Sequence, residues 1–282
     1  MRFGAHMSTS GGAWKALERG RSIHCEVVQV FVKNNMQWFG KTLAPADVAR
    51  YQQELAASQL ACVFGHTGYL INLGAPASAN RENSIKSLIQ EIEIATQLDL
   101  PFLVLHPGAH LGAGEEAGLK QIVAGLDEVL AATRRSRVRI ALENTAGQGT
   151  CLGNKVAHLA EVFDRVRYPK RLGVCLDTAH FFAAGYDLRT PKGWDDAIGE
   201  VEKMLGLKQV LAFHLNDSKT DLGSRVDRHE HIGKGKIGKP GFRHIVRDAR
   251  FKETPGCLET PKSDDLHEDV QNLKTLRSLS RA

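Results

Sequence analysis

Short apolar runs alternate with longer amphipathic segments along the whole chain. The short runs are rich in Val, Ile, Leu, Phe and Cys and lie between Gly, Pro or polar residues, which is typical of buried β-strands. They predict strands at residues 2–6, 26–32, 60–66, 102–106, 138–143, 172–177, 209–214 and 256–259. The longer segments repeat apolar residues at helical spacing. They predict helices at residues 11–19, 45–59, 81–98, 115–132, 155–166, 193–205, 240–248 and 264–279.

This alternation predicts a parallel sheet covered by helices, because near-continuous apolar strands are buried on both faces. Eight strand–helix units match a closed (β/α)₈ TIM barrel, whose usual length is about 250 residues. An open doubly wound sheet also alternates strands and helices, but no G-x-G-x-x-G follows the first strand to mark its usual dinucleotide site. Since no linker or low-complexity stretch interrupts the pattern, we expect a single domain over residues 1–282.

Composition and charge add little to this interpretation. The hydrophobic fraction of 42% fits a protein with a buried core, and the net charge of +5 is compatible with a polyanionic partner without requiring one. Five widely spaced cysteines without a C-x-x-C pair are consistent with a reducing compartment. No apolar run approaches the ~18 residues that cross a bilayer, and the start MRFGAHMSTSGG does not resemble a signal peptide. We therefore expect a cytoplasmic, nucleoid-associated protein with no membrane contact.

Residues with metal-ligand chemistry end six successive predicted strands, and these residues are His66, His106, Glu143, Asp177, His214 and Glu259. The carboxyl ends of TIM-barrel strands form the active-site face, so all six side chains are expected at one mouth. Each alone has an ordinary interpretation, as a hydrogen-bonded histidine or a turn-capping carboxylate. Converging together in a region of low dielectric they would need cations or mutual pairing, and a metal cluster is the simplest solution.

Three more candidates are expected in the loops that follow the sixth and seventh strands. His180 lies three residues after Asp177, and Asp227 and His229 form an Asp-x-His pair. Alternate residues of an extended chain point to one side, so this pair can bind one ion. Nine candidates are too many for a single zinc site, which takes three or four protein ligands, and they predict two or three ions.

With these residues in place, the sequence resembles the endonuclease IV family, the zinc-dependent apurinic/apyrimidinic endonucleases of base-excision repair (AP endonuclease family 2), whose fold is the xylose-isomerase-like TIM barrel. The resemblance covers nearly the whole chain. It is carried by the blocks HTGYLINLG at 66–74, LHPG at 105–108, LENTAGQG at 142–149, GVCLDTAH at 173–180, AAGYD at 183–187, HLNDSK at 214–219, GSRVDRH at 223–229 and LET at 258–260.

The resemblance implies a trinuclear zinc site in which Glu143 is the catalytic residue. It places one zinc on His66, His106 and Glu143. A second zinc would bind Asp177, His214 and Glu259, with Glu143 bridging the two. A third would bind His180, Asp227 and His229. Manganese can occupy similar ligands.

The implied reaction is hydrolysis of the DNA phosphodiester 5′ to an abasic site, by a metal-bridging hydroxide, leaving a 3′-hydroxyl and a 5′-deoxyribose phosphate. The resemblance also implies removal of blocked 3′ ends. The partner is double-stranded DNA containing abasic sites, and the family suggests a monomer.

DNA contacts are expected from the loops after the second, third and seventh strands. The resemblance places Tyr69 near the lesion, although an ordinary buried tyrosine is the alternative. The other expected DNA-binding residues are Lys33, Asn34, Met36, Gln37, Trp38, Arg225 and Arg228. Met36 departs from the family pattern, which has an arginine there. A methionine can still wedge between bases, but the lost cation should weaken affinity and its salt dependence.

Two other functions stay open on the sequence alone. Sugar isomerases and epimerases on the same barrel resemble this chain in Glu143, Asp177, His214 and Glu259, but they give no reason for the remaining ligands. A metal count separates these possibilities, because an isomerase needs one or two ions and the nuclease three. The other alternative is a DNA-binding module without catalysis, which would bind an abasic duplex and never nick it.

Overall fold

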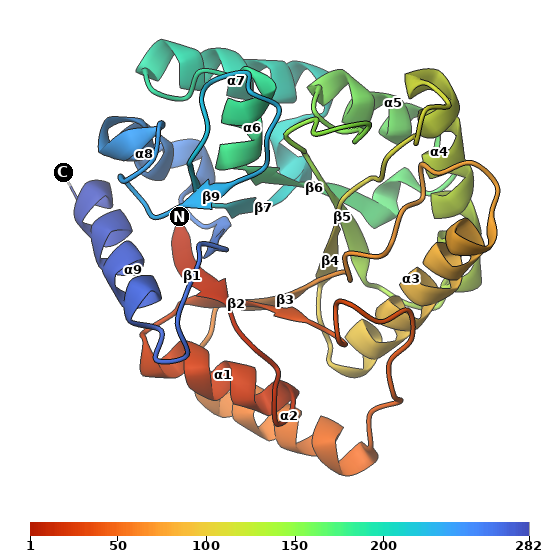
Figure 1. Cartoon of the computed structure of the whole chain (residues 1–282). Helices are drawn as coiled ribbons and strands as arrows, with labels where there is room; N and C mark the ends of the chain where they lie inside the picture. The colour runs from red at the N-terminus through yellow and green to blue at the C-terminus, as the bar shows by residue number, and fades with distance from the viewer. Residues whose placement is uncertain (282) are drawn as a thin grey trace.

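The computed structural model describes residues 1–281 and confirms the predicted (β/α)₈ barrel. Eight parallel strands close in the order β1-β10-β7-β6-β5-β4-β3-β2. They are β1 (Arg2–His6), β2 (Val27–Phe31), β3 (Cys62–His66), β4 (Phe102–Leu105), β5 (Arg139–Glu143), β6 (Leu172–Asp177), β7 (Val210–His214) and β10 (Pro255–Leu258). Figure 1 looks into this ring of strands, with the helices arranged around it. Each strand agrees with a predicted one to within three residues at either end.

The covering helices also follow the prediction. They are α1 (Ala13–Ser22), α2 (Pro45–Ser58), α3 (Ala79–Gln97), α4 (Glu115–Ala132), α5 (Val156–Arg165), α7 (Pro191–Met204), α8 (Gly238–Arg247) and α9 (His267–Ser280). Local signals set several starts: Ser78 accepts a hydrogen bond from Arg81 N at α3, and Thr190 accepts one from Gly193 N at α7. Of the residues that the structure describes, none belongs to a helix long and apolar enough to cross a membrane.

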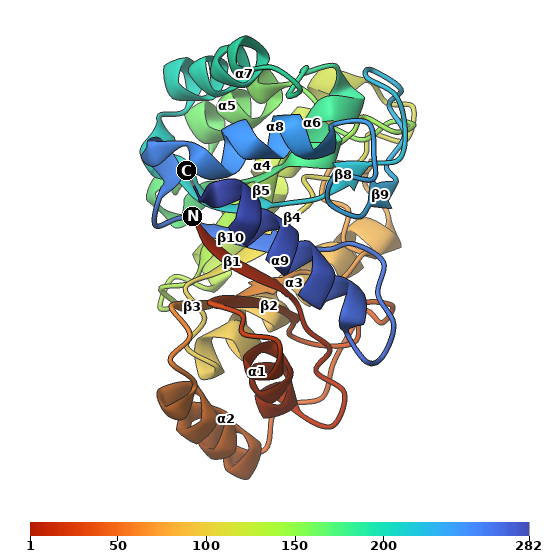
Figure 2. The same ribbon diagram turned by 90° about the vertical axis from the view of Figure 1, so that its left-hand side faces the viewer.

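A short helix after β6 and a two-stranded hairpin were not predicted. Helix α6 (Thr178–Ala184) begins directly after β6, where the Asp177 side chain accepts a hydrogen bond from His180 N at 2.8 Å. Its seven residues are too few to show a helical period, so the expectation that His180 lies in a loop is wrong. A short hairpin of β8 (Asp217–Ser218) and β9 (His229–Glu230) stands at the end of the barrel opposite to both termini (Figure 2).

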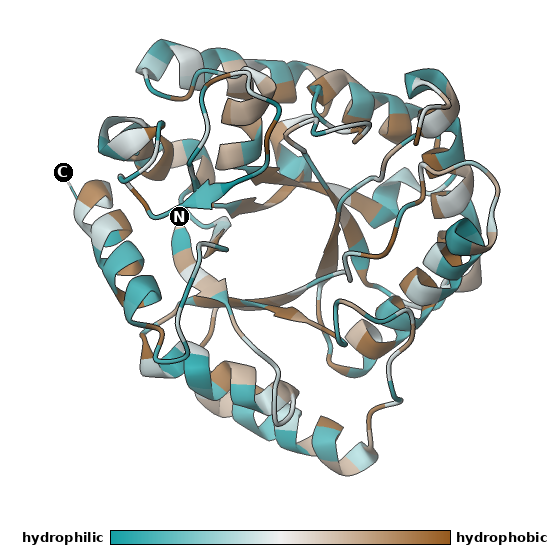
Figure 3. Ribbon diagram, viewed as in Figure 1, coloured by the Kyte–Doolittle hydropathy of each residue, from teal (hydrophilic) through white to brown (hydrophobic). Residues whose placement is uncertain are grey.

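Two apolar layers hold the barrel together. One lies between the strands and the helices, and it contains most of the buried aliphatic residues. The other fills the barrel interior with small and aromatic side chains, namely Phe64, Phe102, Val104, Ala141, Cys175, Ala212 and Cys257. The hydropathy colouring agrees, because the central strands are mostly apolar whereas the helices mix apolar and hydrophilic residues (Figure 3). The interior layer forms the floor beneath the mouth of the barrel.

Phe64 is the most deeply buried aromatic side chain in this floor, and we expect its removal to destabilise the protein. It is fully buried and stacks on Phe102 with ring centroids 4.7 Å apart. Phe64→Ala should lower the free energy of unfolding by about 3–5 kcal/mol, because the rigid barrel cannot collapse around the cavity. Urea denaturation measures the change, and the half-exposed Tyr168→Ala is the control. A loss below about 1 kcal/mol would show that the barrel interior is not packed as described.

Candidate metal centre

Strand alternation places the six strand-end candidates inside the mouth of the barrel. Side chains two residues apart on a strand point to the same face. Each candidate lies two positions after a residue of the interior layer, in the pairs Phe64 and His66, Val104 and His106, Ala141 and Glu143, Cys175 and Asp177, Ala212 and His214, and Cys257 and Glu259. The six side chains therefore form the next layer up, directly above the apolar floor.

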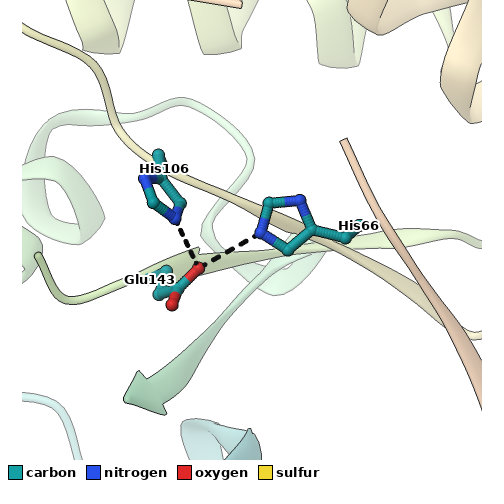
Figure 4. A group of neighbouring side chains, drawn as sticks. All are labelled: His66, His106 and Glu143. Atoms are coloured by element: carbon teal, nitrogen blue, oxygen red, sulfur yellow. Dashed lines mark hydrogen bonds and ion pairs between the residues drawn. The ribbon is translucent and has the colours of Figure 1, made fainter. Parts of the chain in front are cut away.

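Glu143 lies at the centre of this layer and is fully buried. Its Oε2 atom is 3.0 Å from His106 Nε2 and 3.3 Å from His66 Nε2, and both rings point toward it (Figure 4). Its Oε1 atom is 2.8 Å from His214 Nδ1 and 3.3 Å from His180 Nδ1. One carboxylate thus contacts histidines from four different elements, with its two oxygens directed to different sides.

Glu143 also belongs to a second group of ligand atoms, which it shares with Asp177, His214 and Glu259. His214 Nδ1 lies 3.2 Å from Glu259 Oε2 and 3.9 Å from Asp177 Oδ2. All four residues have ligand atoms within 4.8 Å of one another. The geometry therefore suits two neighbouring cations with Glu143 between them.

A third group brings His180 and His229 together beside Asp177. Asp227 joins them, with its oxygens 3.1 Å from His180 Nε2 and 3.4 Å from His229 Nε2. Both of these imidazole nitrogens are buried and have no hydrogen-bond partner in the described part of the chain. Because an unpaired buried polar atom is costly, two converging orphan nitrogens beside carboxylates fit a bound cation.

In His66 and His180, the hydrogen bond made by one ring nitrogen determines that the other is free to bind a metal. The Nδ1 atoms of His66 and His180 lie 2.7 Å and 2.9 Å from the carbonyl oxygens of Thr67 and Asn144. A carbonyl can only accept, so the proton must be on Nδ1, and the Nε2 lone pair is left for a metal. The donor set of imidazoles and carboxylates, oriented in this way, fits zinc.

Electrostatics in the mouth favour a cation as well. Burial raises the pKa of Glu143 and Glu259, but His214 and the other nearby imidazoles outweigh it. The pKa of Glu143 is held well below its ordinary value, and that of Glu259 is lowered to about 2. Burial likewise raises the pKa of Asp227, and the adjacent imidazoles of His180 and His229 lower it further than burial raises it. These carboxylates are therefore ionised at neutral pH, as metal ligands must be.

Three polar residues that the sequence interpretation missed hold the candidate ligands in place. Gln29 Nε2 donates to Glu259 Oε1 at 2.5 Å, and its Oε1 lies 2.7 Å from His214 Nε2. Asn216 Nδ2 donates to Asp177 Oδ2 at 2.7 Å, and Asn144 hydrogen-bonds to the backbone of Asp177. Gln29 could have been found, because it is the one polar residue of the apolar strand VVQVF. Asn144 and Asn216 lie one and two residues after a strand end, where loop residues are commonly polar, and carry no such signal.

His6, at the end of β1, completes this network. Its Nδ1 atom lies 2.9 Å from Gln29 Nε2 and 3.8 Å from Glu259 Oε1. Burial lowers the pKa of His6 to about 3, so this imidazole is neutral at physiological pH. It supports Gln29, which in turn contacts two ligands.

The residues expected to contact DNA occupy the loops around the mouth, and most of them are exposed. Met36 and Tyr69 are 64% and 60% exposed, although both side chains are largely apolar. Lys33 is different, because its side chain is buried against Glu91. Trp38 is partly exposed, and the remaining members of the set are exposed, namely Asn34, Gln37, Arg225 and Arg228.

Comparison with known proteins agrees with the fold and identifies relatives of the chain. Residues 17–279 match the family model described as xylose isomerase-like TIM barrel. A probable endonuclease 4 from Chloroflexus aurantiacus is 49% identical over 278 residues, covering 99% of this chain and 98% of that protein. The crystal structure of endonuclease IV from Thermus thermophilus superposes with a TM-score of 0.87 at 32% identity, covering 99% of this chain and 98% of the other. A D-tagatose 3-epimerase-like protein has a TM-score of 0.74 at 19% identity over 99% and 98% of the two chains, which shows a shared fold alone.

Proposed function

Because this chain belongs to the endonuclease IV family of xylose isomerase-like TIM barrels, we propose that it hydrolyses the phosphodiester 5′ to an abasic site in duplex DNA. The products are a 3′-hydroxyl and a 5′-deoxyribose phosphate. DNA strands with blocked 3′ ends are a further substrate, since they present a phosphoester at the same 3′ oxygen that is released in the cleavage reaction. The observation that carries this proposal is the set of three contiguous ligand groups around Glu143 at the mouth of the barrel.

In this proposal the cofactor is three zinc ions per chain. His66, His106 and Glu143 hold the first, and Asp177, His214 and Glu259 hold the second with Glu143. His180, Asp227 and His229 hold the third, and Asp177 lies close enough to approach it as well, 3.6 Å from His229 Nε2. The same donors accept manganese. A sugar isomerase or epimerase is a weaker assignment for this chain. A site for one or two ions would leave the third ligand group without a role.

Bound zinc would supply an acidified water molecule and stabilise the negative charge that develops on the phosphate oxygens. The protein holds its ligands rigidly to support this chemistry. Glu143 directs one oxygen to each of two groups, so it fixes the spacing between them. Gln29 and Asn216 orient Glu259, His214 and Asp177. Hydrolysis breaks the bond from phosphorus to the 3′ oxygen and needs no side chain as nucleophile.

The substrate is bound by the exposed loops around the mouth. Tyr69 and Met36 present apolar surface that can enter the space left by a missing base, and Arg225 and Arg228 can contact phosphates. Turning out a nucleotide costs less when no base is paired there, which gives selectivity for the lesion. A single chain carries every ligand, so the proposal requires no second subunit.

Tyr69→Ala tests the role of the exposed loops. We expect the affinity for an abasic duplex to fall by about tenfold, because stacking of an aromatic ring in nucleic acid contributes about 1–3 kcal/mol. Fluorescence anisotropy with a labelled duplex measures this change. Tyr168→Ala, a partly exposed tyrosine between α5 and β6 on the other side of the barrel, is the matched control. Equal affinities for wild type and Tyr69→Ala would remove Tyr69 from the DNA interface.

The proposed function is tested by nicking of an abasic duplex together with elemental analysis of the same preparation. We expect one cut 5′ to the lesion, a 3′-hydroxyl product that a polymerase extends, and about three zinc ions per chain. Binding without any cut in the zinc-loaded protein would favour a DNA-binding module. One or two ions per chain, with epimerisation of a ketose, would favour the isomerase alternative.

A further inference from the structure

A buried ion pair lies between the DNA-facing loops and the helix behind them. Lys33 Nζ, in the loop after β2, is 3.0 Å from Glu91 Oε1 on α3, and the two side chains are 3% and 0% exposed. Lys33 Nζ also donates to the carbonyl oxygen of Gln37 at 2.6 Å. With these contacts made in the protein interior, the Lys33 ammonium group is buried and paired rather than exposed on the loop surface.

Glu91 extends this contact to the loop after β3. Its carboxylate accepts hydrogen bonds from Gly68 N at 3.1 and 3.3 Å, and Ser87 Oγ also donates to it. The next residue, Tyr69, donates its backbone N–H to Asn35 O at 3.1 Å, so the two loops are hydrogen-bonded to each other. A side chain at Gly68 would be crowded, because a Cβ atom there would lie 3.0 Å from Lys33 Nζ and 3.2 Å from Asn35 O.

The same helix holds the far end of the first loop. Gln90, next to Glu91 on α3, accepts from Gly40 N at 2.8 Å and donates to Gly40 O at 3.2 Å. The loop after β2 is therefore attached to α3 at Lys33 and again at Gly40. Between these attachments it presents Met36 to solvent, and the loop after β3 presents Tyr69 beside it.

Stability alone does not account for a buried pair of charges. Burial raises the pKa of Glu91 more than Lys33 lowers it, which reflects the cost of removing the carboxylate from water. Apolar side chains of similar size often replace such a pair with no loss of stability. Apolar side chains could not accept the hydrogen bond from Gly68 N or donate one to Gln37 O. What the charged pair adds, and apolar residues could not, is therefore the fixed geometry of the two loops.

We propose that Lys33 and Glu91 are positioning residues for substrate recognition, which fix Met36 and Tyr69 in the arrangement that receives the abasic nucleotide. This inference rests on the proposed function. It reassigns Lys33, which the sequence suggested as a direct DNA contact, to a role behind the binding surface. Affinity for the lesion then depends on a pair of residues that never touches DNA.

The test is the double variant Lys33→Met/Glu91→Leu, which removes both charges together and so avoids leaving one unpaired. We expect the KM for an abasic duplex to rise about tenfold, with kcat within about threefold and zinc content unchanged. Hydrogen exchange supplies a readout that needs no DNA: amides of residues 68 and 69 should exchange at least about tenfold faster. Lys33→Met/Glu91→Gln also removes both charges but keeps an acceptor for Gly68 N, so it should retain most of the protection.

The matched control is Arg250→Met/Asp248→Leu, which removes a half-buried ion pair at the opposite end of the barrel. It should leave KM and exchange at residues 68 and 69 unchanged, even where the melting temperature falls equally. A raised KM with unchanged exchange would overturn the proposal and return Lys33 to direct DNA contact. Faster exchange with an unchanged KM would overturn it too. Failure of the wild-type protein to cut an abasic duplex is a separate result that removes the proposed function, and exchange then decides whether the pair holds the loops.

Discussion

Glu143→Ala should abolish cleavage of an abasic duplex, with a fall in kcat of roughly 10³-fold or more, while part of the DNA affinity is retained. The physical reason is the position of the carboxylate, which contacts His66, His106, His180 and His214 and belongs to two of the three ligand groups. Removing a single preorganised charge-stabilising group commonly costs 10²–10³-fold in rate, and this change should weaken two ion sites at once. The loops that present Met36 and Tyr69 are untouched, so binding should persist.

Single-turnover cleavage and anisotropy on the same preparations measure the two effects separately. Asp127→Ala is the matched control, because Asp127 is also a buried carboxylate but pairs with Arg167 on the outer layer of the barrel. It should lower stability and leave cleavage intact. Glu143→Gln keeps the size of the side chain and removes its charge, so it should resemble Glu143→Ala in rate. Full activity in either Glu143 variant would show that Glu143 is not shared between ions.

The sequence was sufficient to predict the barrel and the gathering of the ligands, because both follow from local rules. Strands such as 172–177 are recognisable from a continuous apolar run, and in a parallel barrel all strand ends meet at one mouth. Alternation then decides direction: Cys175 is buried among the interior residues, so Asp177 must point the same way. The assignment of Glu143 to the centre came from family resemblance, since strand order alone does not say which carboxylate is shared.

Local rules fail where a side chain's role depends on partners distant in sequence. Lys33 is an ordinary exposed-loop cation by its neighbours, and only its contact with Glu91, 58 positions away, shows that it is buried. Gln29 is 185 residues from His214 in sequence and 2.7 Å from it in the structure. Helix α6 was not predicted because its capping residue, Asp177, was already counted as the end of a strand. Such contacts are set by tertiary packing, and no sequence period records them.

Removing the metal should abolish cleavage and destabilise the fold as well. The mouth contains the carboxylates of Glu143, Asp177, Glu259 and Asp227 in close contact, and ions that bind only the folded protein stabilise it. At a free metal concentration of 100 times Kd, each site contributes about 2.7 kcal/mol. For a chain of 282 residues, about 1 kcal/mol corresponds to roughly 2 °C, so each ion should raise the melting temperature by roughly 5 °C. Zinc added back to the chelated protein should restore both melting temperature and cleavage.

Counting ions in site variants then separates a trinuclear centre from a smaller one. Asp227→Ala should reduce the zinc content from about three to about two ions per chain, since His180 and His229 are then left only with Asp177, which also belongs to the second ligand group. Its melting temperature should fall by about the contribution of one site, with cleavage reduced roughly 10²-fold or more. Asp221→Ala, a highly exposed carboxylate in the same connection after β7, is the control and should bind as many ions as the wild type. An Asp227→Ala protein with undiminished zinc content would place the third ion elsewhere. A wild-type count of one or two zinc ions would remove the third ion altogether. The unpaired ring nitrogens of His180 and His229 would then need a partner other than a metal.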